Sequence, residues 1–217
     1  MSHRIFIVDD HPISRMGLAQ LLRLEQDIEV CGEAGSAREA LDRIGESKPD
    51  LALIDITLPD KSGLELIKDI AAMYPKVLTL VLSMHDEQLY AERVLRAGGR
   101  GYIMKEAAPE HLSRAIRRVL AGDIYVSDAM SMRLLKLFTG KGPERTPASP
   151  LERLSDREME VFQLIGHGKA SREIAEQLCI SIRTIDAHRA HIKEKLGLKD
   201  ATELVRYAVR WVETGTM

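Results

Sequence analysis

Residues 5–12 read IFIVDDHP, a run of four apolar residues that passes into two adjacent carboxylates and then into a histidine and a proline. A short apolar run of this kind is typical of a strand buried on both faces of a sheet. Proline is accepted in the first turn of a helix, so the stretch predicts a strand, an acidic turn and a helix in direct succession. Adjacent carboxylates raise the free energy needed to ionise each other. The pair is therefore either neutralised by a cation or solvated in a loop.

The same alternation of apolar run and helically spaced segment recurs four more times before residue 122. Strands joined through helices pair in parallel by right-handed crossovers, which leaves a sheet covered on both faces. The N-terminal part is thus predicted to be α/β, a (βα)5 doubly wound parallel sheet. Its predicted strands are 5–8, 28–31, 51–54, 77–82 and 102–104.

The pattern changes after residue 122. Residues 128–138 fit one more helix, and residues 139–150, TGKGPERTPASP, contain three prolines and two glycines, which is typical of a flexible linker. We therefore expect three parts: a domain over 1–122, a linker helix and linker over 123–150, and a second domain over 151–217.

The second domain is predicted to be all-α. It has no strand signal, and four helices fit residues 156–166, 172–178, 182–196 and 201–213. The predicted helix ends rest on capping boxes at Ser155 and Asp200, on N-caps at Ser171 and Ser181, and on a C-cap at Gly197.

Composition narrows the class of protein. The chain has 217 residues, a net charge of -2 and two cysteines, Cys31 and Cys179, whose separation matches no metal-binding spacing. We expect both to pack as small hydrophobic residues in a reducing compartment. No signal peptide and no apolar run of about 18 residues is visible, so a soluble cytoplasmic protein without a membrane partner is expected.

Polar side chains stand at the ends of four predicted strands: Asp9 and Asp10, Asp55, Ser83, and Lys105. In a doubly wound sheet these ends line one crevice. Clustered carboxylates suit Mg²⁺, and a carboxylate beside an ammonium and a hydroxyl suits phosphoryl chemistry. Each aspartate taken alone also fits a helix N-cap, so the interpretation rests on the joint pattern.

Residues 4 to about 121 resemble the receiver domain of two-component response regulators. The resemblance lies in VDDHP at 8–12, LIDITLP at 53–59 with Gly63, Ser83, the Gly101-Tyr102 pair and Lys105. The sequence departs from many receivers because Glu106, and not proline, follows the lysine. A cis peptide before a non-proline residue costs about 3 kcal/mol, so none is assumed there.

The resemblance implies a role for each matching residue. Asp55 is implied to be the phosphoacceptor, which takes its phosphoryl group from the histidine of a sensor kinase. Mg²⁺ is implied to be held by Asp9, Asp10, Asp55 and the backbone carbonyl of Thr57. Ser83, Tyr102 and Lys105 are implied to contact the phosphoryl group and to switch conformation.

A local positive charge marks residues 181–199. The second domain as a whole has 11 basic and 11 acidic side chains, but this segment has five basic residues against Asp186 and Glu194. A positive excess favours contact with phosphates, and the tight connection at 179–181 fits a helix-turn-helix. A charged, solvated helix face is the alternative. Ile182, Ile185, Ile192 and Leu196 are expected to face the domain core.

This domain resembles the LuxR-type DNA-binding domain, through LSDRE at 154–158, IA at 174–175, TI at 184–185 and HR at 188–189. Together with the receiver it makes the chain similar to a NarL/FixJ-type regulator. The resemblance implies that double-stranded DNA is contacted by Arg183, Thr184, Asp186, Ala187, Arg189, Ala190 and Lys193. Of these, Asp186, Ala187 and Ala190 stand where the family reads bases. Asp186 either accepts from cytosine or only pairs with Arg183 or Arg189.

The sequence thus predicts a transcription regulator whose DNA binding is controlled by phosphorylation of Asp55 and which forms a homodimer on activation. It is not expected to be an enzyme, apart from slow self-dephosphorylation. A phosphohydrolase is disfavoured because no Asp-x-Asp pair surrounds Asp9 or Asp55. A regulator controlled by protein contacts, without phosphorylation, is the open alternative.

Overall fold

The computed structural model describes residues 2–139, 149–178 and 180–214. The chain divides into two compact units, residues 1–140 and 141–217, and each is described by itself. Most of the linker predicted over 139–150, and Cys179 in the predicted 179–181 connection, lie outside the described residues. The boundaries predicted at 122 and 150 stay a prediction.

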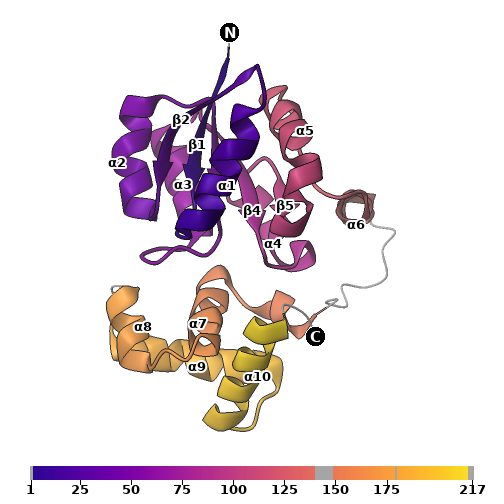
Figure 1. Ribbon diagram of the computed structural model, residues 1–217. Coiled ribbons are helices and arrows are strands. Elements are labelled where there is room, and N and C mark those ends of the chain that lie inside the picture. Colours follow the sequence, from indigo (N-terminus) through magenta and orange to yellow (C-terminus); the bar gives the residue numbers. More distant parts are fainter. Residues whose placement is uncertain (1, 140–148, 179, 215–217) are drawn as a thin grey trace. The chain divides into compact units, whose positions relative to one another are not determined.

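The first unit is built on a five-stranded parallel sheet with the order β2-β1-β3-β4-β5 (Figure 1). This confirms the predicted doubly wound α/β class. Its strands are β1 (His3–Val8), β2 (Ile28–Ala34), β3 (Leu51–Ile54), β4 (Leu78–Ser83) and β5 (Tyr102–Met104). The second strand is longer than predicted because its last residues continue the pairing with β1 up to Ala34.

Helices cover both faces of this sheet. Ile5 and Ile7 of β1 belong to one buried cluster with residues of α1 and α5, while α3 contacts both α2 and α4. The helices are α1 (Pro12–Arg23), α2 (Ala37–Ser47), α3 (Gly63–Met73), α4 (Glu87–Arg96), α5 (Ala108–Leu120) and α6 (Asp128–Thr139). A 3₁₀ turn over Lys105–Ala107 links β5 to α5.

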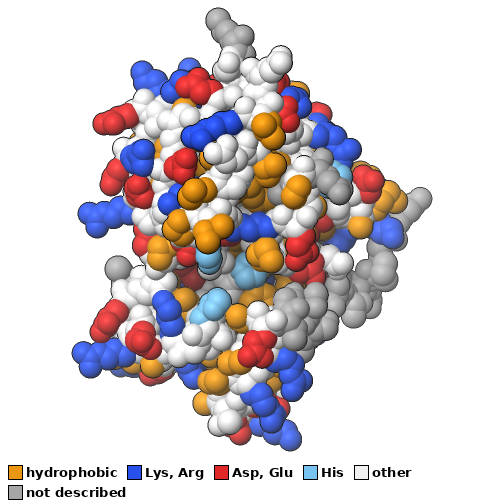
Figure 2. All heavy atoms as spheres, viewed as in Figure 1, with side chains coloured by type: hydrophobic (Ala, Val, Ile, Leu, Met, Phe, Trp, Pro, Cys, Tyr) orange, Lys and Arg blue, Asp and Glu red, His pale blue; other side chains and the backbone are white. Residues whose placement is uncertain are grey.

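The helical spacing that predicts α1, formed by Ile13, Gly17, Leu21 and Leu24, does not mark its buried face. Leu18, Ala19 and Leu22 face the core, whereas Ile13 and Leu24 are 87% and 81% exposed. Hydrophobic side chains accordingly gather on the surface over α1 (Figure 2). As predicted, Pro12 begins the helix.

The segment after α5 is attached to the first unit. Tyr125 pairs in parallel with Gly101, donates its amide to the carbonyl of Arg100 (2.9 Å) and accepts from the amide of Tyr102 (2.8 Å). Ser127 donates its amide to Oε1 of Glu87 at the start of α4 (2.8 Å). Part of the outer edge of β5 is thereby paired, which protects an edge that otherwise invites association.

The second unit is helical, as predicted. It contains α7 (Asp156–Gly166), α8 (Ser171–Gln177), α9 (Ile182–Leu196) and α10 (Ala201–Thr214), preceded by a 3₁₀ turn over Pro150–Arg153. Phe162, Ile185, Ile192 and Trp211 are all buried in its core. No helix among the described residues is long and apolar enough to cross a membrane.

Most of the predicted helix caps are present. Ser155 and Glu158 form the capping box of α7, Ser181 accepts from the amide of Thr184 at the start of α9, and Gly197 ends that helix with φ 68°. The prediction for Ser171 is wrong. The N-cap of α8 is Ala170, whose amide donates to Glu173, so Ser171 is already the first helical residue.

Substitution of Gly63 is expected to destabilise the first unit. A Cβ at this position would meet the carbonyl oxygen of Asp55 and lie 2.8 Å from Cα of Ile56, and both are backbone atoms that cannot rotate away. Gly63→Ala should lower the free energy of unfolding by about 1–3 kcal/mol in urea titrations followed by circular dichroism.

Gly17→Ala is the matched control. Gly17 lies inside α1, and a Cβ there would meet nothing within 4 Å. This variant should be more stable than the wild type by about 0.5–1 kcal/mol because alanine favours the helix. Equal effects of the two substitutions would contradict the close approach at Gly63.

Candidate functional site

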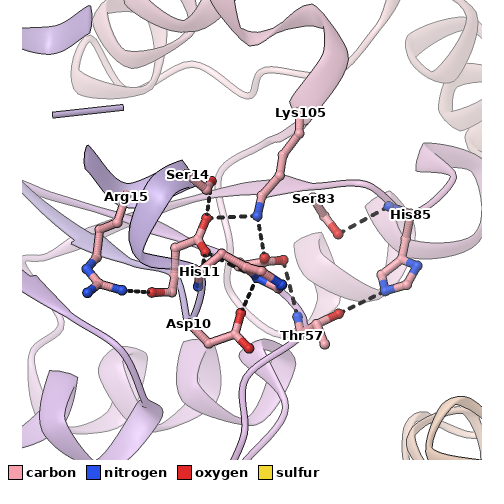
Figure 3. Close-up of polar contacts among 10 residues, drawn as sticks. Asp10, His11, Ser14, Arg15, Thr57, Ser83, His85 and Lys105 are labelled. Carbon is pink, nitrogen blue, oxygen red and sulfur yellow. Dashed lines mark hydrogen bonds and ion pairs between the residues drawn. The ribbon is translucent and has the colours of Figure 1, made fainter. Parts of the chain in front are cut away.

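An ammonium group joins the carboxylates at the ends of two strands. Nζ of Lys105, just after β5, lies 2.7 Å from Oδ2 of Asp9, after β1, and 2.6 Å from Oδ2 of Asp55, after β3 (Figure 3). Both carboxylates are buried, with relative exposures of 1% and 5%. The three residues therefore meet at one edge of the sheet.

The surroundings of Asp9 and Asp55 shift the pKa values of these two buried aspartates in opposite directions. Burial raises the pKa of Asp9, but hydrogen bonds from Lys105, Ser14 and the His11 amide outweigh it, so the pKa of Asp9 falls. Burial raises the pKa of Asp55, and the attraction of Lys105 offsets this only in part. Burial would lower the pKa of Lys105, but the two carboxylates outweigh it and raise this pKa. The lysine stays charged, and Asp55 holds the less favourable negative charge.

Asp10 leaves part of the site unsatisfied. Its Oδ1 atom is buried and accepts no hydrogen bond of acceptable geometry, although Nδ1 of the exposed His11 lies 2.6 Å away. Ligand atoms of Asp9, Asp10, His11 and Asp55 all lie within 4.8 Å of one another. Hard cations such as Mg²⁺ take carboxylate oxygens in this way, so the residues fit the predicted metal ion.

His85 connects the other flank of Asp55 to the loop after β4. The Thr57 amide donates to Oδ1 of Asp55 (3.2 Å), and the Thr57 hydroxyl lies 3.0 Å from Nε2 of His85 (Figure 3). The His85 amide donates to the hydroxyl of buried Ser83 (3.3 Å), and its carbonyl accepts from the hydroxyl of Tyr102 (2.6 Å). Tyr102 therefore faces inward, and burial raises its pKa well above the ordinary value.

The peptide after Lys105 has ordinary geometry. None of the described residues is joined by a cis peptide bond, and this includes Lys105 and Glu106. The chain makes a single 3₁₀ turn before α5, which has Pro109 in its first turn.

Two contributors to this site were not predicted from the sequence. Ser14 donates its hydroxyl to Oδ2 of Asp9 (2.7 Å), and Nη1 of Arg15 donates to the Asp9 carbonyl (2.5 Å). Both lie in the first turn of α1. The signal was available, because a helix that begins directly after an acidic turn brings its first polar side chains back over that turn.

The candidate DNA surface lies on α9. Ile185 and Ile192 are fully buried, and Asp186, Ala187 and Ala190 are exposed, as expected for a helix with one face in the core. The expectation that Ile182 faces the core is wrong, since it is 47% exposed. It is the first residue of the helix, about one turn before the buried Ile185.

Two charged residues of this segment have specific partners. Oδ1 of Asp186 accepts from the Ser171 hydroxyl on α8 (3.4 Å), and within the described part of the chain it forms no ion pair with Arg183 or Arg189. Nζ of Lys195 donates to Oε2 of Glu158 (2.6 Å), which is buried. Lys195 therefore stabilises the unit internally, and the basic excess available at the surface is smaller than the sequence count.

Two family matches cover most of the chain. Residues 5–117 match the response regulator receiver domain, and residues 152–208 match the bacterial regulatory proteins of the luxR family. These matches, the doubly wound fold and the helix-turn-helix unit define a response regulator with a receiver domain and a LuxR-type DNA-binding domain.

Similar proteins cover nearly the whole length. The oxygen regulatory protein NreC of Staphylococcus aureus strain MRSA252 is 40% identical over 210 residues, which is 95% of this chain and 97% of the relative. RcsB of Salmonella enterica serovar Typhimurium, bound to promoter rprA with the phosphomimetic BeF3-, is 26% identical with a TM-score of 0.75 and covers 96% and 99% of the two chains. A structure described as a two-component response regulator RcsB–DNA complex has a TM-score of 0.74 at 26% identity, with coverages of 96% and 99%. The chain belongs to the two-component response regulators of the NarL/FixJ type, which are transcription regulators.

Lys195→Met is expected to destabilise the second unit in a pH-dependent way. Burial raises the pKa of Glu158, but bonds from Lys195 and Ser155 outweigh it, so the folded pKa lies below 4.5. A lowered folded pKa gives stability that is present above the unfolded pKa and lost as the pH falls through the folded one. Since Lys195 is 38% exposed and partly screened, the variant should lose about 1–2 kcal/mol near pH 7 and less below pH 4.

Trp211, the single tryptophan, is buried in this unit, so its fluorescence reports unfolding there and not in the receiver. Lys199→Met is the control. It removes an exposed lysine just beyond α9, the helix that carries Lys195, and should change stability by less than about 0.5 kcal/mol. A loss that did not change with pH would argue against the pair with Glu158.

Proposed function

We propose that Asp55 is the phosphoacceptor of this regulator, and that Asp9, Asp10, Asp55 and the Thr57 carbonyl hold Mg²⁺ beside it. The observation that carries the proposal is the cluster of Asp9, Asp10 and Asp55, in which two buried carboxylates share one lysine and Oδ1 of Asp10 has no hydrogen bond beside its ion-pair contact with the exposed His11. Such a site is electrostatically incomplete, and a divalent cation satisfies it.

In the reaction, a carboxylate oxygen of Asp55 attacks the phosphorus of a phosphohistidine on a sensor kinase. The phosphorus–nitrogen bond breaks as the new phosphorus–oxygen bond forms, and the histidine leaves. The raised pKa of Asp55 marks a carboxylate whose charge is poorly stabilised, which favours its use as a nucleophile. When bound, Mg²⁺ supplies positive charge for the phosphoryl oxygens.

Lys105 is the residue that senses the new group. Its ammonium is shared between Asp9 and Asp55. After phosphorylation, the charged phosphoryl oxygens are a stronger partner for it than the uncharged carbonyl oxygen that Asp55 keeps in the acyl phosphate. Ser83 and Tyr102 act with it. Ser83 turns its hydroxyl toward the phosphoryl group, and Tyr102 follows the loop, because both are bonded to the backbone of His85.

The second unit is proposed to bind double-stranded DNA through α9 in the major groove. The exposed Asp186, Ala187 and Ala190 face bases, while Arg183, Thr184, Arg189 and Lys193 hold phosphates. Phosphorylation is proposed to favour a homodimer on paired half-sites, in the cytoplasm. The RcsB complex with a promoter and BeF3- supports the combination of phosphoryl mimic and DNA in one regulator of this architecture.

Control by protein contacts alone is the second candidate function. It is favoured only if the acidic site proves unable to accept a phosphoryl group. The residues of the site support the ability to be phosphorylated, which is distinct from control of DNA binding by phosphorylation. The experiment below separates the two.

Asp55→Asn should abolish Mg²⁺-dependent modification by acetyl phosphate. The amide oxygen is a poor nucleophile, so intact-protein mass spectrometry should find the added phosphoryl mass in the wild type and less than about one hundredth of it in the variant. Asp42→Asn, which alters an exposed aspartate on α2, should be modified like the wild type. An unmodified wild type, or equal modification of Asp55→Asn, would favour control by protein contacts.

Lys193→Ala should weaken DNA binding uniformly across operator sequences. A lysine on a phosphate releases counterions, so the slope of log affinity against log salt should become less steep by about 0.9 for each protomer, or about 1.8 for the dimer on paired half-sites. The measurement is fluorescence anisotropy with several operators at several salt concentrations, using BeF3--treated protein. Asp186→Ala is the matched comparison and should change the ranking of operators with little change in slope. The assignment of Lys193 to a phosphate fails if its loss alters sequence preference and leaves the slope unchanged.

A further inference from the structure

Arg15 holds the peptide group that leads into Asp10. Its Nη1 atom donates to the carbonyl oxygen of Asp9 (2.5 Å), and its Nε atom lies 3.4 Å from Oε2 of Glu33 on β2 (Figure 3 draws the bond to Asp9). The Arg15 side chain is only 21% exposed. The guanidinium therefore lies over the acidic turn, anchored to the neighbouring strand.

The carbonyl of Asp9 follows the last backbone group of this segment that is hydrogen-bonded to β2, which is the Asp9 amide. The Asp9 amide still donates to Ala34 on β2 (3.1 Å), but β1 ends at Val8. Because a peptide group is planar, fixing its oxygen also fixes the direction of the next Cα, which belongs to Asp10. The side chain of Asp9 is fixed separately, by the His11 amide and by Lys105.

We propose that Arg15 is a positioning residue for the cation site: it holds the Asp9–Asp10 peptide so that the Asp10 carboxylate stays directed toward Asp55 before any ion arrives. The inference rests on the proposed Mg²⁺ site. Side chains that orient metal ligands typically alter metal affinity by about 10- to 100-fold. Oδ1 of Asp10 has no hydrogen bond and lies 2.6 Å from Nδ1 of the exposed His11, which belongs to the same turn, so the direction of the Asp10 carboxylate depends on how the backbone of this turn is held.

Two effects of Arg15 on a cation oppose each other. Its positive charge repels Mg²⁺, whereas its hydrogen bond orders the ligands. Arg15→Lys separates them because lysine keeps the charge and lacks the planar fork that reaches the carbonyl and Glu33 together. If Arg15→Lys binds Mg²⁺ more weakly than the wild type, the loss therefore comes from poorer positioning of the Asp10 carboxylate and not from a change in charge.

Arg43→Lys is a matched control. Nη1 of Arg43 donates to the backbone carbonyl of Glu33 (2.6 Å) and to Oε1 of Glu39 (3.0 Å), so this arginine also ties a helix to β2 through a carbonyl. Arg43 forms no hydrogen bond or ion pair with Asp9, Asp10, His11 or Asp55. Any general effect of loosening β2 should appear in both variants.

The experiment titrates the full chain with Mg²⁺ alone and follows backbone amide shifts by NMR. Arg15→Lys should raise the dissociation constant for Mg²⁺ by about 10-fold, and Arg43→Lys should leave it within about 2-fold of the wild type. Equal constants for the wild type and Arg15→Lys, or equal losses in both lysine variants, would overturn the inference. A wild type that binds no Mg²⁺ would instead contradict the proposed metal site.

Glu33→Asp keeps the test decisive if Arg15→Lys fails to fold. The shorter aspartate retains the charge but withdraws from Nε of Arg15, so the guanidinium loses its anchor. We expect a smaller loss of Mg²⁺ affinity in the same direction, together with a cooperative thermal transition like that of the wild type. An unchanged dissociation constant in folded Glu33→Asp would overturn the inference.

Discussion

The shared ammonium of Lys105 is the interaction on which the receiver site depends. Three strands end at this point, and each delivers a group whose burial is unfavourable alone: Asp9, Asp55 and the lysine itself. Removing one member of such a buried set leaves an uncompensated charge. The arrangement is stable only while the lysine serves both carboxylates. The proposed phosphoryl group on Asp55 would therefore alter the charge interactions of Lys105 with Asp9 and of the end of β5 together.

Through the same contacts, the proposed phosphorylation of Asp55 would affect the edge of the sheet. Tyr102 follows Gly101 into β5, its hydroxyl is bonded to His85, and its amide is bonded to Tyr125 in the segment that leads to α6. The loop after β4 and the segment after α5 are therefore both hydrogen-bonded to Tyr102. A displacement of His85 toward Asp55 changes contacts of Tyr102 on both sides.

The sequence predicts those parts of the site that follow from position along a strand. Asp9, Asp55 and Lys105 could be found because parallel strands end at one edge, and the period of the apolar residues locates those ends. Lys195 could not be assigned, because its role depends on the rotation of α9 about its axis. For Arg15, the helix start directly after the acidic turn indicates that the side chain lies near the turn, but not that it binds the Asp9 carbonyl. The exposed Ile13 makes the same point: helical spacing locates α1, but packing against β1 and α5 decides which face is buried.

Both units contain a buried carboxylate paired with a lysine from a distant element, and the difference between them separates structure from reactivity. In the second unit, Oε2 of Glu158 accepts from Ser155 and Lys195, and the pKa of Glu158 falls, so the pair is satisfied and stabilises the fold. In the first unit, one lysine serves two carboxylates, the pKa of Asp55 rises, and Oδ1 of Asp10 lacks a hydrogen bond. An ion pair is therefore weak evidence for a functional site by itself. The unmet demand for positive charge is what distinguishes a site that awaits a ligand from one that only holds helices together.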